Sequence, residues 1–144
     1  MGKLKVYLDN CCFNRPFDEQ SYLKIRLETE AKIYVQQKII NGAYELAWSY
    51  ILDVENNRNP DEEVRVAISD WKKIATVYCK ENEQILKYAE SLQDFGIKPR
   101  DALHVACAVY LDADYFLTTD RRLSNKRIRE IPILNPLDFI VLEG

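Results

Sequence analysis

Short apolar runs typical of strands alternate along this chain with longer segments of helical periodicity. The strand-like runs cover residues 4–8, 44–49, 115–119 and 132–134, with one further candidate at 139–142. Consecutive strands joined by helices pair in parallel through right-handed crossovers. The alternation therefore predicts an α/β fold, a three-layer α/β/α sandwich around a central, mainly parallel sheet.

The segments between the strand-like runs carry the signals of helices. We expect helices at about 21–40, after Ser49, and at 61–78, 81–95 and 100–111. Gly42 closes the first helix where a left-handed residue is favoured, and Pro99 suits the first turn of the last helix. With 47% hydrophobic and 30% charged residues and no linker-like tract, residues 1–144 are expected to form a single domain.

The composition argues against several classes of protein. Every apolar run is much shorter than the roughly 18 residues that span a bilayer, and the first residues do not resemble a secretion signal. The four cysteines lack a C-x-x-C spacing, which favours reduced thiols in a cytoplasmic protein. The net charge of −3 speaks against coating nucleic acid through bulk positive charge.

A local basic surface is nevertheless predicted from one cluster of cations near the C-terminal end. Its members are Arg121, Arg122, Lys126, Arg127 and Arg129. Such a cluster can contact phosphates, although a basic run is more often simply a solvated surface.

Four carboxylates are expected to meet at one edge of the sheet. Asp9 and Asp120 end strand-like runs, and ligands of parallel sheets bind beyond the carboxyl ends of the strands. Glu55 lies on the short helix after the second run, and Asp101 lies in the first turn of the helix before the third. Crowded carboxylates repel one another unless cations neutralise them, and their hard oxygens suit Mg²⁺ or Mn²⁺. The pattern therefore predicts a divalent-metal site that can activate water against a phosphodiester.

Each of these acids also has a simpler explanation when it is taken alone. Asp101 could only favour a helix N-terminus, Glu55 could be a surface acid, and Asp9 could be a turn residue. Asp53 competes with Glu55, but side chains two residues apart on a helix point about 200° apart, so only one can face the site. The single histidine, His104, is expected to pack or to hydrogen-bond rather than to catalyse.

Four stretches occur in the order and spacing of one known family. They are Val6–Asn10, Ser49–Glu55, Pro99–Ala106 and Phe116–Asp120. Through them the chain resembles the PIN-domain ribonucleases of the VapC toxin type. The resemblance implies a Rossmann-like PIN fold, Mg²⁺- or Mn²⁺-dependent cleavage of RNA, frequent homodimerisation and often a small antitoxin partner.

The resemblance also implies roles for individual residues. By position, the family's metal-holding and catalytic acids correspond to Asp9, Glu55, Asp101 and Asp120. Cys11 and Cys12 depart from the pattern, because small hydroxyl residues are common at these positions in the family.

The sequence thus predicts a metal-dependent endoribonuclease, the toxin of a toxin–antitoxin pair. Its candidate substrate contacts are Arg15, Arg121 and Arg122, and for Arg15 a structural salt bridge is an equally simple explanation. A phosphotransferase with Asp9 as nucleophile is disfavoured, because no second acid follows two residues later and no lysine follows a strand end to bind phosphate. The alternative is a non-catalytic PIN-fold binding or assembly module, since a fold does not guarantee an activity.

Overall fold

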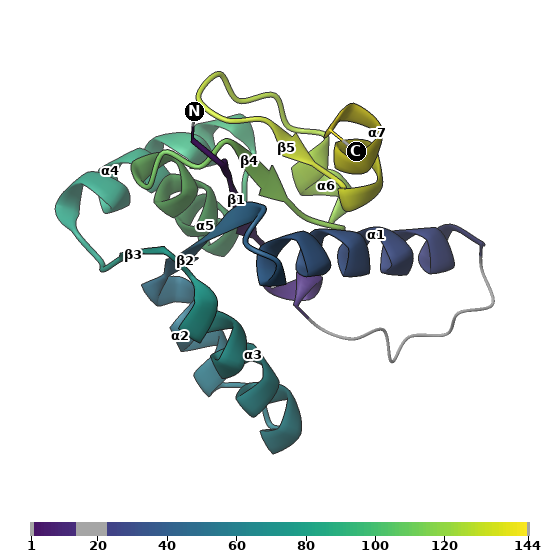
Figure 1. Ribbon diagram of the computed structural model, residues 1–144. Coiled ribbons are helices and arrows are strands. Elements are labelled where there is room, and N and C mark those ends of the chain that lie inside the picture. Colours follow the sequence, from purple (N-terminus) through teal and green to yellow (C-terminus); the bar gives the residue numbers. More distant parts are fainter. Residues whose placement is uncertain (1, 14–22, 144) are drawn as a thin grey trace.

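The computed structural model describes residues 2–13 and 23–143. Its centre is a five-stranded, all-parallel sheet with the order β3-β2-β1-β4-β5 (Figure 1). The strands are β1 (Leu4–Leu8), β2 (Tyr44–Ser49), β3 (Val77–Cys79), β4 (Tyr115–Leu117) and β5 (Ile133–Leu134). The parallel α/β architecture expected from the sequence is confirmed.

Helices lie on both sides of this sheet (Figure 1). The α-helices are α1 (Leu23–Ile40), α2 (Tyr50–Asn57), α3 (Glu62–Ile74), α4 (Glu83–Leu92), α5 (Pro99–Tyr110), α6 (Arg121–Ser124) and α7 (Pro136–Glu143). Two short 3-10 helices are η1 (Asn10–Cys12) and η2 (Gln93–Phe95). Helix α1 packs with α7, and α4 packs with α5. Among the described residues, no helix is both long and apolar enough to span a membrane.

The path of the chain through the sheet fixes where a ligand can bind. From the central strand β1 the chain adds β2 and then β3 on one side, and it later adds β4 and β5 on the other. The strand order therefore reverses between β1 and β4. The crevice outside the carboxyl ends of two such strands is the usual ligand site of a parallel sheet. Asp9 directly follows β1 at this point, and Asp120 follows β4 after two threonines.

Two predicted elements differ from the observed ones. Residues 61–78 are not one helix, because α3 ends at Ile74 and Val77–Cys79 forms the edge strand β3, in which Val77 pairs with Ala47. The β-branched pair Thr76 and Val77 favours an extended chain at this point, and the Thr76 amide donates to the Leu46 carbonyl at 3.0 Å.

The second difference concerns the run at 139–142, which was expected to be a strand. It belongs to α7 instead. The Asn135 side chain accepts from the Leu137 amide at 2.9 Å, and Pro136 occupies the first position of the helix. A short apolar run does not distinguish a strand from a buried helix face, so the capping residues decided the outcome.

Helices α2 and α3 form a hairpin that projects away from the sheet (Figure 1). Its base is set by Ser49, whose side chain accepts from the Leu52 amide at 3.4 Å and caps α2, as the sequence predicts. Asn56 joins the two helices by donating to the Arg65 carbonyl at 3.1 Å and to the Ser69 hydroxyl at 3.3 Å. Glu55 therefore belongs to a helix that is fixed both to the sheet and to its neighbour.

Candidate metal and active site

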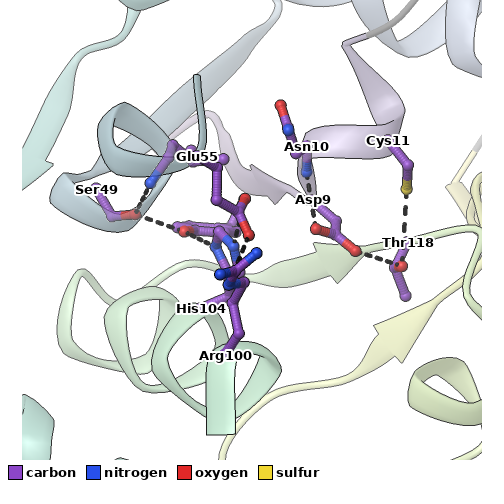
Figure 2. Close-up of polar contacts among 10 residues, drawn as sticks. Asp9, Asn10, Cys11, Ser49, Glu55, Arg100, His104 and Thr118 are labelled. Atoms are coloured by element: carbon purple, nitrogen blue, oxygen red, sulfur yellow. Dashed lines mark hydrogen bonds and ion pairs between the residues drawn. The ribbon is translucent and has the colours of Figure 1, made fainter. Parts of the chain in front are cut away.

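Asp9 is held rigidly at the end of β1. Its amide donates to the Leu117 carbonyl at 2.9 Å, which continues the pairing of β1 with β4. Its carboxylate accepts from the Asn10 amide at 2.8 Å and from the hydroxyl of buried Thr118 at 2.8 Å (Figure 2). The Thr118 oxygen also accepts from the Asp120 amide at 3.1 Å, so one threonine links the two strand-end acids.

Glu55 is held by two side chains of α5. Its Oε1 lies 2.9 Å from His104 Nε2, and its Oε2 lies 3.7 Å from Arg100 Nε (Figure 2). The side chain of Glu55 is only 12% exposed, and that of His104 is 1% exposed. Because the carboxylate accepts, the ring nitrogen Nε2 donates, and the orientation of Glu55 depends on this buried histidine.

Asp53 points to a different part of the molecule. Its carboxylate accepts from the Trp48 indole at 2.9 Å and from the Tyr78 hydroxyl at 2.8 Å, and it forms an ion pair with Lys72 at 3.0 Å. As the helical geometry requires, only Glu55 of the two α2 acids faces Asp9.

A chain of buried hydrogen bonds continues behind His104. Its Nδ1 lies 2.6 Å from the Tyr7 hydroxyl, which lies 2.6 Å from Ser49 Oγ. Burial raises the pKa of Tyr7 well above its ordinary value, so this phenol keeps its proton. The Tyr7 hydroxyl therefore links His104 Nδ1 to Ser49 while His104 Nε2 donates to Glu55. The chain of contacts thus fixes the ring orientation of His104.

Asp101 and Asp120 lie on the other side of the candidate site. Burial raises the pKa of Asp101, and the negative charges of Asp9, Asp120 and Glu55 raise it further, whereas His104 lowers it. The other three predicted acids therefore lie within electrostatic reach of Asp101. Asp120 is exposed and caps α6 by accepting from the Arg122 and Leu123 amides at 2.9 and 3.4 Å.

The geometry brings one group of possible metal ligands close together. Single ligand atoms of Asp9, Glu55 and His104 all lie within 4.8 Å of one another. The two carboxylates offer hard oxygens, which suit Mg²⁺ or Mn²⁺, while the His104 nitrogen is already engaged by Glu55. Asp101 and Asp120 line an adjoining open pocket rather than this group.

The predicted substrate contacts have different positions. Arg122 lines the pocket with Asp101 and Asp120. Arg121 begins the same short helix but is not among the described residues that line the pocket. Arg15 lies outside the residues that the structure describes.

Cys11 lies beside the strand-end acids. Thr119 donates to its sulfur at 3.2 Å, and hydrogen bonding by the Cys12 thiol lowers the pKa of Cys11 to about 7. The Cys11 thiol is therefore more acidic than an ordinary cysteine. This soft sulfur lies near Asp9 but is not a ligand that Mg²⁺ favours.

Sequence reasoning missed two residues of the site. Tyr7 contacts His104, and Arg100 contacts Glu55. Arg100 directly precedes Asp101, so its motif gave a weak signal. Tyr7 gave none, because a buried tyrosine in a strand is usually a core residue.

Comparisons with known proteins agree with this geometry. The sequence model of the PIN domain matches residues 6–129. The chain therefore belongs to the PIN domain family. No curated protein matches the sequence significantly.

Two solved structures are similar to the whole fold. One is VapBC2 from Rickettsia felis, bound to a DNA fragment from its promoter, with a TM-score of 0.60. The other is DNA-bound VapBC from Salmonella typhimurium, with a TM-score of 0.57. Each match has 14% sequence identity and covers 92% of this chain and 98% of the other chain. At this identity the likeness concerns the fold.

Proposed function

We propose that residues 1–144 act as one PIN nuclease domain, a metal-dependent endoribonuclease that hydrolyses RNA phosphodiester bonds. The observation that carries this proposal is the meeting of Asp9 and Glu55 at the point where the strand order reverses. After burial, the carboxylates of Asp9, Asp120 and Glu55 also raise the pKa of Asp101, and a divalent cation would relieve this crowding of negative charge.

The donor set fits Mg²⁺ or Mn²⁺. Asp9 and Glu55 would hold the ion from the fixed side of the site, and Asp101 and Asp120 would complete its surroundings from the open side. When bound, such an ion supplies an activated water and stabilises the leaving oxygen of a phosphodiester. Glu55 keeps its orientation through His104, and Asp9 keeps its orientation through Thr118.

The substrate is proposed to approach from the basic side. Arg122 lies in the pocket next to the acids, and Arg121 and Arg15 remain proposed phosphate contacts. Arginine suits this role because its planar fork donates two hydrogen bonds to a phosphate.

We further propose that the protein is the toxin of a toxin–antitoxin pair, acts in the cytoplasm and forms a homodimer. Both structural neighbours are VapBC assemblies, which supports an antitoxin partner for this chain.

Cleavage of a mixed pool of single-stranded and hairpin RNAs tests the function. The wild type is assayed with Mg²⁺, Mn²⁺ or EDTA, beside Asp9→Asn and the control Asp70→Asn. Asp70 is an exposed acid on α3 that pairs only with Lys73 among the described residues. We expect cleavage by the wild type and by Asp70→Asn with either metal, and none with EDTA or by Asp9→Asn.

Two results would contradict the proposal. Cleavage by Asp9→Asn or in EDTA would remove the acids or the metal from the reaction. A folded wild type that neither cleaves RNA nor binds Mn²⁺ would favour the non-catalytic PIN-fold binding or assembly module.

A further inference from the structure

An open pocket adjoins the acidic cluster on the side of Asp101 and Asp120. Its lining residues are Gly96, Ile97, Lys98, Asp101, Asp120, Arg122, Leu123 and Lys126. Two segments contribute the cations: Lys98 lies in the loop before α5, and Arg122 and Lys126 lie in and just after α6. Three positive side chains therefore converge beside the acids of a protein whose net charge is negative.

These three cations keep their charge available. The ion pairs formed among the described residues involve Lys72, Lys73, Arg100 and His104, and none involves Lys98, Arg122 or Lys126. Asp101 and Asp120 line the same pocket, yet they do not approach these cations within ion-pair distance. An anion that enters the pocket would therefore meet unneutralised donors.

The structure also positions Lys126 at the wall of the pocket. Its ammonium group donates to the Phe95 carbonyl at 3.0 Å. Gly96, with φ of +81°, leaves the space for this contact, because a Cβ there would lie 2.9 Å from Lys126 Nζ. The contact occupies one of three N–H donors, so two donors and the full charge remain for a ligand.

We propose that this pocket binds the phosphate of the nucleotide next to the scissile bond, through Lys98, Arg122 and Lys126. The inference rests on the proposed nuclease function and adds a defined subsite to it. Phosphate fits the donors because ammonium and guanidinium groups form short, charge-assisted hydrogen bonds with its oxygens. We place this phosphate next to the scissile bond of the RNA because Asp101 and Asp120 line the pocket and also belong to the set of four predicted acids.

The contribution of Lys126 is measured as the affinity for RNA of a protein that does not cleave it. A fluorescent single-stranded RNA that the wild type cleaves is titrated by anisotropy into the Asp9→Asn protein. We expect Lys126→Gln in this background to weaken binding about 5- to 10-fold and to reduce the salt slope by about one. Lys87→Gln is the matched control, since it removes an exposed positive charge from α4, outside the pocket and outside the predicted basic cluster, and it should change the affinity less than about twofold.

A second measurement identifies the phosphate itself. RNAs that carry one neutral methylphosphonate are compared, with the modified linkage moved stepwise away from the mapped cleavage position. A methylphosphonate at one linkage next to that position should weaken RNA binding by the Asp9→Asn protein. The same modification should cause no further loss of binding when the protein also carries Lys126→Gln. Such non-additivity identifies two groups that touch each other. Lys98→Gln, an exposed change at the other wall, should give the same coupling to the same linkage.

The outcomes separate the pocket from the nuclease. Cleavage by the wild type, together with additive effects at every linkage or equal effects of Lys126→Gln and Lys87→Gln, overturns the pocket proposal and leaves the nuclease proposal intact. Coupling between Lys126 and a linkage far from the cleavage position, with none near it, would also overturn the pocket proposal and leave the nuclease proposal intact. A wild type that does not cleave has no mapped position, and this result overturns both proposals.

Discussion

The two sides of the candidate site are built in opposite ways. On the Asp9 and Glu55 side, both carboxylates accept hydrogen bonds from donors that are themselves buried, Thr118 and His104. On the Asp101 and Asp120 side, the pocket is open and its cations form no ion pair with a described carboxylate. The Asp9 and Glu55 side therefore keeps its geometry without a ligand. The Asp101 and Asp120 side keeps cations that are available to bind an anionic ligand. This contrast suits a resident metal on one side and an exchanging substrate on the other.

The largest expected effect separates two acids of the same helix. Glu55→Gln should reduce RNA cleavage more than about 100-fold, since loss of even an outer partner of a metal ligand costs about 10- to 100-fold. Asp53→Asn should leave cleavage within a fewfold and should lower the free energy of unfolding by about 1 kcal/mol through the pair with Lys72. Cleavage rates and urea unfolding of both variants measure this. An equal loss of cleavage in the two variants would show that cleavage depends on the integrity of helix α2 and not on the carboxylate of Glu55.

The next effect tests the fixed side through metal binding. His104→Leu should weaken Mn²⁺ binding about 10- to 100-fold, because Glu55 loses the donor that orients it. His104→Gln keeps a donor amide and should lose less. Electron paramagnetic resonance of free Mn²⁺ gives both affinities directly, independently of RNA cleavage. Equal affinity in the wild type and in both variants would show that His104 only packs.

A smaller effect tests whether the two sides act separately. Arg122→Gln should raise the KM for RNA about 5- to 10-fold and leave kcat and Mn²⁺ affinity nearly unchanged, because it removes a cation from the open side only. Steady-state kinetics and the same resonance titration measure the three quantities. A parallel loss of Mn²⁺ affinity would contradict the division of the site.

The smallest effect concerns stability without metal. Because burial and neighbouring acids raise the pKa of Asp101, the folded state holds its proton more tightly than the unfolded state. This group therefore lowers stability as pH rises from its ordinary value of 3.8 through the folded pKa. Asp101→Asn should slightly raise the thermal midpoint of the metal-free protein at neutral pH, and the difference should vanish below about pH 3.

The opposite result has a clear meaning. Loss of a negative charge in the first turn of α5 costs up to about 1 kcal/mol, so a lower midpoint would identify Asp101 mainly as a helix-terminal charge. Addition of Mn²⁺ provides the control, since it should raise the midpoint of the wild type more than that of the variant.

The sequence was sufficient to predict the architecture and the edge at which the acids gather. Asp9 and Asp120 follow apolar runs, and parallel strands bring such positions to one edge whatever the details of packing. It was not sufficient for β3, because a three-residue edge strand takes its identity from pairing with β2. The Tyr7 to His104 bond and the pocket at Lys98 and Lys126 were also inaccessible, since both depend on which segments pack side by side.

The order in which the chain is synthesised gives the Thr118 contact a further meaning. Asp9 emerges before the hydroxyl that orients it, because Thr118 comes 109 residues later in the chain. The ring that orients Glu55 comes 49 residues after it, and its own support, Tyr7, lies 97 residues before that ring. Contacts of such long range close late, because the loops between them must be ordered first. A nascent chain therefore has no assembled acidic centre until β4 and Thr118 have left the ribosome.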